Sequence, residues 1–328
     1  MTLRAFLTVL CLPLIALLLG GCSSCSGDKP APVDTTPKIQ LALNWVPEPE
    51  FGGFYAAREG GAFKRGGLEV DIQPGGAGAP VVQRVAAGQV DYGVVGGDEV
   101  LSARAKGADV IPLFAVYQTS PQAIMVHASL GLNTIADTLK SGITLALEPG
   151  LPYATYLRKR YGFHNVKLVP YDGGVARFAA DVNFGQQCFI TSEPIAARKK
   201  GANPKVLLVA DEGYNPYVAV LITRKALWKE KPAQVKAMIA AVREGWKSYL
   251  ADPAPTNAVM AKQNPAMDLE TFAAAAEAQK PLIETAETQQ KGLGTMSRDR
   301  WDLLGRQLVE LEVVDRPPPL DDYLFSFE

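Results

Sequence analysis

Short apolar runs alternate with segments of helical period along most of the chain. Residues 38–45 form an apolar run that predicts a buried strand, and residues 52–60 have helical spacing and end at a glycine. Two more strand–helix pairs follow, with strands expected at 68–72 and 90–95 and helices at 81–88 and 98–107. Strands that alternate with short helices imply a parallel sheet covered on both faces.

A second series of the same kind begins after a long apolar stretch at 110–126. Residues 117–121, with the sequence Tyr-Gln-Thr-Ser-Pro, interrupt this stretch and predict a strand that leaves one lobe and enters another. Strands are then expected at 143–147, 166–170 and 187–191, each followed by a helix. Residues 206–222 predict a return crossing, and helices are expected beyond it at 233–250, 267–277 and 298–311.

Two segments resemble each other weakly and indicate two similarly built lobes. Gly88-Gln89 precedes an expected strand that leads to Asp98, and Gly185-Gln186 precedes one that leads to Glu193. We therefore predict an α/β protein whose first lobe is formed by residues 38–118 plus 218–328. The second lobe is expected to be formed by residues 119–217.

The N-terminal residues have the pattern of a bacterial lipoprotein signal. Arg4 precedes an apolar run at 5–19, and small residues lie directly before Cys22. The run is shorter than the roughly 20 residues that a membrane-spanning helix needs. We expect residues 1–21 to be a signal peptide, Cys22 to be lipidated and residues 22–37 to be a flexible tether. An uncleaved anchor helix is the alternative.

Composition excludes several classes of function. The formal net charge of −1 gives no electrostatic footprint for nucleic acid. The four cysteines are too scattered to predict a disulfide framework. His127 and His164 are the only histidines, and neither has a carboxylate or cysteine at a metal-ligand spacing, so no metal and no cofactor are expected.

Candidate binding residues follow the predicted strands, because ligands of open α/β sheets lie beyond the carboxyl ends of the strands. These candidates, with the crossings included, are Asn44, Trp45, Phe51, Tyr55, Gly76, Asp98, Gln118, Ser120, Glu148, Tyr153, Tyr171, Asp172, Glu193 and Tyr214. Aromatic rings and carboxylates without basic residues suit a planar ligand that donates hydrogen bonds. Backbone amides of the glycine-rich turns leave an anionic ligand as the alternative.

Several of these residues also have a purely structural interpretation. Glycines after strands commonly form turns, and Trp45 or Tyr55 could pack in the core. Asp98 and Glu193 could serve only to stabilise helix N-termini. Their matching positions in the two similar segments favour a shared cleft.

The motifs of the chain resemble those of a known family. Residues 43–47 (Leu-Asn-Trp-Val-Pro), 51–57 and 61–70 resemble solute-binding proteins for thiamine-precursor pyrimidines. Residues 87–93, 117–121 and 191–194 resemble the wider group, which includes alkanesulfonate, taurine and riboflavin binders. The resemblance implies a type II periplasmic-binding-protein clamp of two lobes, each a mostly parallel sheet flanked by helices, with two hinge crossings. It also implies that Asn44, Trp45 and Glu193 hold the ligand ring.

The resemblance further implies a function. The chain is expected to be a monomeric, extracytoplasmic lipoprotein that binds a planar heteroaromatic ligand and delivers it to an ABC permease and its ATPase. It would contact the membrane only through its lipid and would not be an enzyme. The alternatives are an alkanesulfonate, taurine or riboflavin binder, a sensor, and a pyrimidine-synthesising enzyme of the same fold. The signal peptide, the scarcity of histidine and the lack of a cysteine-rich motif argue against the enzyme.

Overall fold

The computed structural model of the protein describes residues 38–148 and 150–325. The predicted signal peptide, the lipidation site at Cys22 and the tether lie outside the described residues. Within the described part of the chain, no helix is both long enough and apolar enough to cross a membrane.

The first sheet contains five strands in the order β2-β1-β3-β10-β4. They are β1 (Ile39–Leu43), β2 (Val70–Gln73), β3 (Tyr92–Val95), β4 (Ile111–Tyr117) and β10 (Val218–Thr223). β1 pairs in parallel with β2 and β3, whereas β10 is antiparallel to both β3 and β4. Four strands therefore share one direction, and the strand that returns from the second sheet runs opposite to them.

The second sheet repeats this arrangement in the order β7-β6-β8-β5-β9. Its strands are β5 (Gln122–His127), β6 (Thr144–Leu147), β7 (Lys167–Pro170), β8 (Phe184–Phe189) and β9 (Pro204–Leu208). β6 is parallel to β7 and β8, and the entering strand β5 is antiparallel to β8 and β9. Two equivalent sheets confirm the predicted two-lobed α/β fold. Each sheet is mixed because its crossing strand is inserted between parallel ones.

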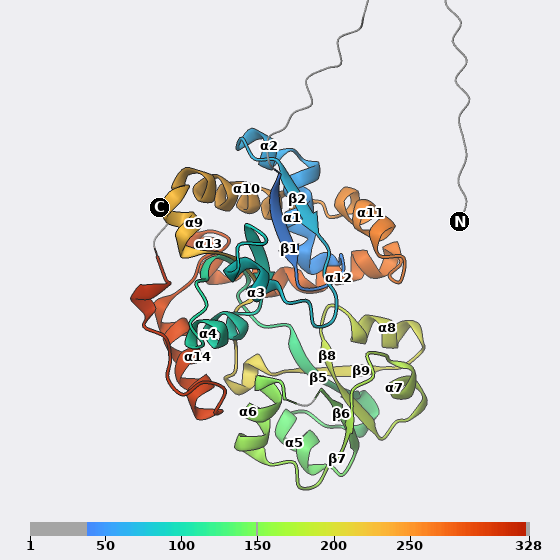
Figure 1. Ribbon diagram of the computed structural model, residues 1–328. Helices are drawn as coiled ribbons and strands as arrows, with labels where there is room; N and C mark the ends of the chain where they lie inside the picture. The colour runs from blue at the N-terminus through green and yellow to red at the C-terminus, as the bar shows by residue number, and fades with distance from the viewer. Residues whose placement is uncertain (1–37, 149, 326–328) are drawn as a thin grey trace, which may run out of the picture. The chain divides into compact units, whose positions relative to one another are not determined.

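Two short segments connect the sheets. The first joins Tyr117 at the end of β4 to Gln122 at the start of β5, and the second joins Leu208 in β9 to Val218 in β10. Figure 1 shows the two sheets in separate parts of the described chain. The two crossings expected from the sequence are thus present, whereas the residue bounds of the lobes stay a prediction.

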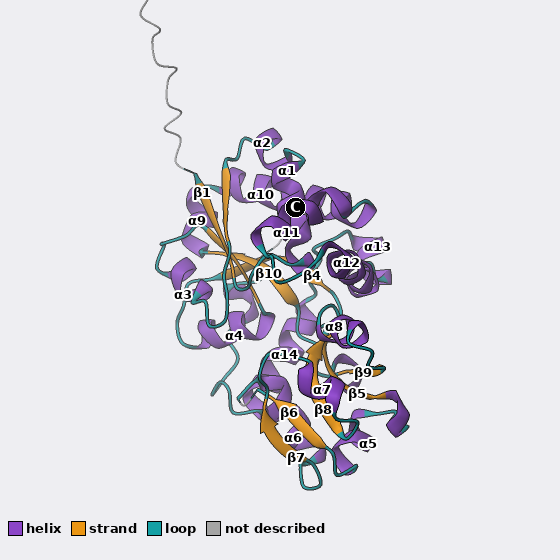
Figure 2. Ribbon diagram, turned by 90° about the vertical axis from the view of Figure 1, so that its right-hand side faces the viewer, coloured by secondary structure: helices purple, strands orange, loops and turns teal. Residues whose placement is uncertain are grey.

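Helices flank both sheets. Figure 2 shows α3 and α4 on one side of the first sheet and α1 and α10 on the other. The helices of the first half are α1 (Gly52–Glu59), α2 (Ala62–Arg65), α3 (Val81–Ala86), α4 (Gly97–Ala105), α5 (Ile135–Lys140), α6 (Pro152–Tyr161), α7 (Ala176–Ala180) and α8 (Glu193–Lys199). Those of the second half are α9 (Lys225–Glu230), α10 (Pro232–Ala251), α11 (Ala254–Gln263), α12 (Leu269–Ile283), α13 (Ala286–Lys291) and α14 (Arg298–Glu310).

Helix α1 packs very closely on α10 because glycines line the contact. A Cβ atom on Gly53 would lie 2.2 Å from the ring of Trp246, and one on Gly245 would lie 2.2 Å from the carbonyl oxygen of Gly53. The Trp246 ring stands edge-on to Phe54 at 6.1 Å. The Gly52-Gly53 motif therefore has a packing role, since it brings α1 against the aromatic side chains of α10.

One strand differs from its predicted position. The strand expected at 187–191 is β8, which begins three residues earlier and contains Gly185 and Gln186. Gly185 pairs with Leu145 in the sheet, and a Cβ atom there would lie 3.0 Å from Ile143 and 3.2 Å from the Met125 carbonyl oxygen. The glycine thus serves close packing inside the strand. The prediction that Gly185-Gln186 precedes the strand is wrong, although β3 and β8 hold equivalent places in the two sheets.

Candidate functional site

A cavity of about 650 Å³ is lined by residues from both sheets and from both crossings. Asn44 and Trp45 follow β1, Asp98 lies in the first turn of α4 after β3, and Glu148 follows β6. These positions lie at the carboxyl ends of strands, where ligands of open α/β sheets bind. Nine of the fourteen candidate residues line the cavity: Asn44, Trp45, Asp98, Ser120, Glu148, Tyr153, Tyr171, Glu193 and Tyr214.

Trp45 is an accessible aromatic residue in the lining of this cavity. Its side chain is 41% exposed, whereas Trp246 and Trp301 are fully buried. A tryptophan left accessible beside a cavity can stack on a planar ligand. Its position agrees with the cleft wall expected from the sequence.

Two other predicted aromatic residues lie in the core. Phe51 and Tyr55 are both fully buried, and the Tyr55 hydroxyl donates to Gln263 Oε1 at 3.3 Å. They turn away from the cavity because α1 is packed against α10 and α11. The Gly-Gly motif beside them specifies this packing, so neither side chain lines the cavity.

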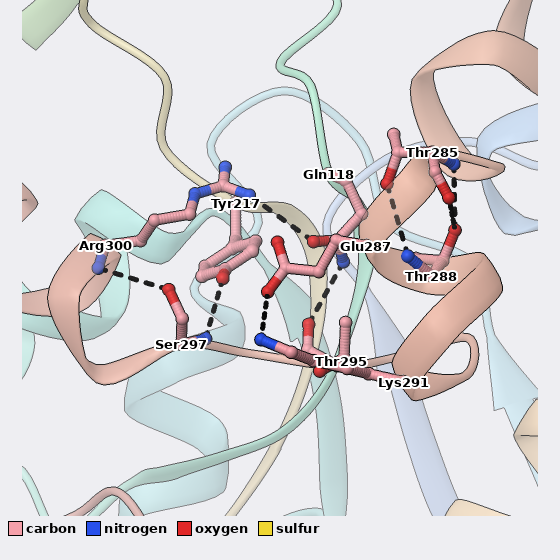
Figure 3. Close-up of polar contacts among 9 residues, drawn as sticks. All are labelled: Gln118, Tyr217, Thr285, Glu287, Thr288, Lys291, Thr295, Ser297 and Arg300. Atoms are coloured by element: carbon pink, nitrogen blue, oxygen red, sulfur yellow. Dashed lines mark hydrogen bonds and ion pairs between the residues drawn. The ribbon is translucent and has the colours of Figure 1, made fainter.

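Three further candidates lie outside the cavity lining. Figure 3 shows Gln118 between Arg300 and Thr295, where its amide nitrogen donates to the Thr295 carbonyl oxygen at 3.0 Å. Asp172 closes its own turn by accepting from the Gly174 amide at 3.0 Å. Gly76 accepts from the Ala79 amide in a turn. Asp172 and Gly76 therefore stabilise local turns, and Gln118 holds the first crossing against the segment that contains Thr295.

Glu193 is held in the cavity by two donors. Its Oε1 accepts from the Tyr171 hydroxyl at 2.6 Å, and its Oε2 accepts from the Phe189 amide at 2.8 Å. Burial raises the pKa of Glu193, and these hydrogen bonds oppose the rise. Both donors are neutral, so the carboxylate is oriented without being neutralised.

Gln187 is a lining residue that the sequence analysis missed. Its Oε1 accepts from the Tyr153 hydroxyl and from the Glu148 amide, each at 2.6 Å. The side-chain amide nitrogen receives no hydrogen-bond partner from the described residues, and the residue is only 7% exposed. With its oxygen already used, Gln187 can donate through this nitrogen to a ligand.

Glu48 and Glu50 were also missed, and they add two carboxylates to the lining. Burial raises the pKa of Glu48 to about 7, which the Trp45 side chain partly opposes. Burial, with the nearby Glu48 and Glu193, raises the pKa of Glu50 to about 8. Their position just after the first strand was the available signal, but it was applied only to Asn44 and Trp45.

The cavity is acidic. None of the described lining residues is a lysine, arginine or histidine. In the described part of the chain, no group of three histidine, cysteine or acidic side chains is arranged to hold a metal ion. Such a lining offers hydrogen-bond acceptors and aromatic faces but no side-chain cation for a sulfonate or phosphate.

Comparisons with known proteins agree with this architecture. The riboflavin-binding protein RibY of Chloroflexus aurantiacus is 26% identical over 261 residues, which cover 73% of each chain. The formylaminopyrimidine-binding protein of Halalkalibacterium halodurans is 21% identical, over 97% of this chain and 98% of the relative. A pyrimidine phosphate synthase of Saccharomyces cerevisiae, THI11, is 25% identical over 67% of this chain and 69% of its own.

A solved structure gives the same fold. The periplasmic aliphatic sulphonate binding protein SsuA of Escherichia coli superposes with a TM-score of 0.64 at 16% identity, over 89% of this chain and 93% of its own. Residues 48–256 match the model of the family described as NMT1/THI5 like. Because this match spans more than half of the chain and strands of both sheets, the chain belongs to the NMT1/THI5-like family.

Proposed function

We propose that this protein is an extracytoplasmic solute-binding lipoprotein that captures a small planar heteroaromatic ligand and delivers it to an ABC importer. One observation carries the proposal. A cavity lined by residues from two sheets and from the two crossings that join them includes an accessible Trp45 and the Tyr171–Glu193 pair. The ring would stack on a planar ligand while the carboxylates accept its N–H groups.

Hinge closure is the proposed mechanism. Ligand would first bind to Trp45 and its neighbours on the first sheet, and the second sheet would then close with Glu148, Tyr171 and Glu193. The crossings at 118–121 and 209–217 would absorb the rotation. Ligand populates the closed state because it contacts both sheets only there.

The N-terminal pattern gives the proposed location. Removal of residues 1–21 and lipidation of Cys22 would anchor the binding body through the tether at 22–37. A permease and its ATPase would be the partners. The family membership and the fold of SsuA support this role, since SsuA is described as a periplasmic binding protein.

The relatives supply two alternatives. The match to RibY favours riboflavin as a second ligand class, because that relative is described as riboflavin-binding. The match to yeast synthases favours an enzyme of the same fold as a third possibility. Mass spectrometry of the protein and ligand after incubation distinguishes binding from catalysis, because a binding protein leaves both unchanged.

The test is titration calorimetry of the purified full-length protein against aminopyrimidine thiamine precursors, thiamine, riboflavin and small alkanesulfonates. Binding of a pyrimidine-containing ligand supports the proposal. Binding of riboflavin alone would favour the second class, and binding of a sulfonate alone would contradict the stacked-ring site. Absence of binding to every compound of the panel would contradict the proposal of a heteroaromatic ligand.

A further inference from the structure

Six carboxylates line the cavity without any basic partner. They come from both sheets and are Glu48, Glu50, Asp98, Glu99, Glu148 and Glu193. No described lysine, arginine or histidine forms an ion pair with any of them. Like charges gathered in one partly enclosed space disfavour one another, and burial adds a further cost to each.

Helix capping accounts for part of this cluster. Asp98 and Glu99 lie in the first turn of α4, and Glu99 accepts from the Gly96 amide at 2.9 Å. Glu193 lies in the first turn of α8 and is oriented by Tyr171. Glu48 and Glu50 flank Pro49 after β1. Glu48 is the N-cap residue of the short 3-10 helix Pro49–Phe51 but makes no side-chain capping hydrogen bond, and Glu50 lies within that helix.

Two buried amides fix this loop so that its carboxylates face the cavity. The Asn264 amide donates to the Pro47 carbonyl oxygen at 3.1 Å, and the Gln279 amide donates to the Pro49 carbonyl oxygen at 3.0 Å. No described residue donates a hydrogen bond to the Glu50 carboxylate. The protein therefore holds an acidic group in the cavity lining and supplies no partner for it.

Aromatic rings and an unpartnered amide also line the cavity. Trp45, Tyr153, Tyr171 and Tyr214 border the same cavity, and rings of this kind attract cations through their faces. The free amide nitrogen of Gln187 can donate to an acceptor atom of the ligand. Carboxylates and aromatic faces without a basic side chain form a surface complementary to an organic cation.

We propose that this cavity selects a positively charged ligand, a planar nitrogen heterocycle with a quaternary or protonated ring nitrogen. The inference rests on the proposed function and adds the charge of the ligand to it. The cation supplies the positive charge that Glu48, Glu50 and Glu193 lack, and it is held against Trp45. Neutral rings of equal shape gain the stacking and can donate N–H groups, but they leave the negative charge of the carboxylates uncompensated.

Matched pairs of ligands test charge at constant shape. Thiamine is compared with its neutral thiophene analogue, in which carbon replaces the charged ring nitrogen. 1-Methylnicotinamide is compared with 3-methylbenzamide in the same way. Calorimetry on the full-length protein should give at least tenfold tighter binding of a cation than of its neutral partner in at least one pair.

Variants locate the effect in the cavity. Glu50→Gln should weaken binding of the preferred cation about tenfold and change binding of its neutral analogue less than threefold. Glu48→Gln is the second variant if Glu50→Gln fails to fold. Glu230→Gln is the matched control, because Glu230 is exposed at the end of α9 and does not line the cavity.

Protons provide an independent readout. Because the pKa of Glu48 lies at about 7 and that of Glu50 at about 8, both hold protons part of the time near neutral pH. A bound cation stabilises their ionised forms, so its binding should release protons, and its affinity should rise from pH 6 to 8.5. Glu193 on α8 and Tyr117 on β4 interact electrostatically with this pair of carboxylates. Asp98, Glu99 and Glu148 line the same cavity, and α12, which donates from Gln279 to the loop, carries the Lys280–Glu277 ion pair.

The outcomes separate the charge from the function. Equal affinity for both members of each pair would contradict the proposal that the ligand is a cation, and it would leave the proposed planar-ligand function unaffected. Binding of choline, without binding of any heterocycle, would support a positively charged ligand but contradict the proposal that the ligand is a planar heterocycle. Binding of a sulfonate, or of nothing in either panel, would overturn both. Unchanged affinity of Glu50→Gln for the cation would remove the loop from the site.

Discussion

At the residue scale, Trp45 is the side chain on which the proposed ligand site depends. Replacing Trp45 with alanine removes the stacking surface and should weaken ligand binding by about 2 kcal/mol or more, as for central aromatic anchors. Calorimetry measures the change. Trp45→Phe should recover part of the affinity, and Leu303→Ala, which removes an exposed apolar side chain elsewhere, should leave it unchanged. An affinity of Trp45→Ala equal to that of the native protein would exclude the residue from the site.

The carboxylates of the loop after β1 also affect stability. The pKa of Glu50 is raised by burial to about 8, so the folded state binds more protons than the unfolded state between roughly pH 4.5 and 8. The free energy of unfolding of the ligand-free protein should therefore fall as pH rises through this window. Melting temperatures measured by calorimetry from pH 5 to 8.5 show how the stability changes with pH.

Glu50→Gln should flatten this pH dependence, because the glutamine stays neutral throughout. Glu230→Gln should keep the native slope. A melting temperature of the native protein that rises from pH 5 to 8.5 would contradict the burial of these carboxylates.

At the element scale, the contact between α1 and α10 allows no added atom. A Cβ atom on Gly245 would meet the Gly53 carbonyl oxygen at 2.2 Å and the Ala57 Cβ at 2.6 Å, so the helices must move apart. Gly245→Ala should destabilise the protein by about 2 kcal/mol, despite the higher helix propensity of alanine. Thermal unfolding measures the loss. Ser248→Ala on the exposed side of α10 should change stability by less than about 0.5 kcal/mol.

The elements themselves follow closely from local sequence. The first three strand–helix pairs lie where apolar runs and helical spacing place them, because burial imposes a local period. Gly185 shows where prediction from local sequence fails. A glycine beside polar residues indicates a turn, but here it lies within β8, where Met125 and Ile143 leave no room for a larger residue.

At the scale of the whole molecule, Arg300 connects the two crossings. Its guanidinium donates to Gln118 Oε1 at 3.4 Å on the first crossing and to the Asn215 carbonyl oxygen at 3.0 Å on the second. The guanidinium carbon also lies 3.8 Å from the centre of the Tyr217 ring. Figure 3 shows Arg300 beside Tyr217 and Gln118. One side chain of α14 therefore orders both segments that would form the hinge.

Removing this side chain should affect stability and the hinge together. Arg300→Met should lower the free energy of unfolding by about 2 kcal/mol, because it leaves polar groups of both crossings unpartnered. Arg306→Met on the same helix should have little effect, since its ion pair with Asp302 is exposed. Thermal unfolding compares the two variants. Equal stability of Arg300→Met and the native protein would show that the crossings are held by other contacts.

Sequence alone determined the order of strands and helices, the two-lobed α/β fold and the edge of the sheets at which candidates cluster. Those properties depend on local apolar period and on the rule that ligands lie beyond strand ends. Tertiary structure decided which side chains reach the cavity. Phe51 and Tyr55 turn into the core because α10 covers α1, whereas Glu48 and Glu50 turn into the cavity because Asn264 and Gln279 hold their loop. These amides lie 217 and 230 residues further along the chain than their partners, beyond the reach of any local pattern.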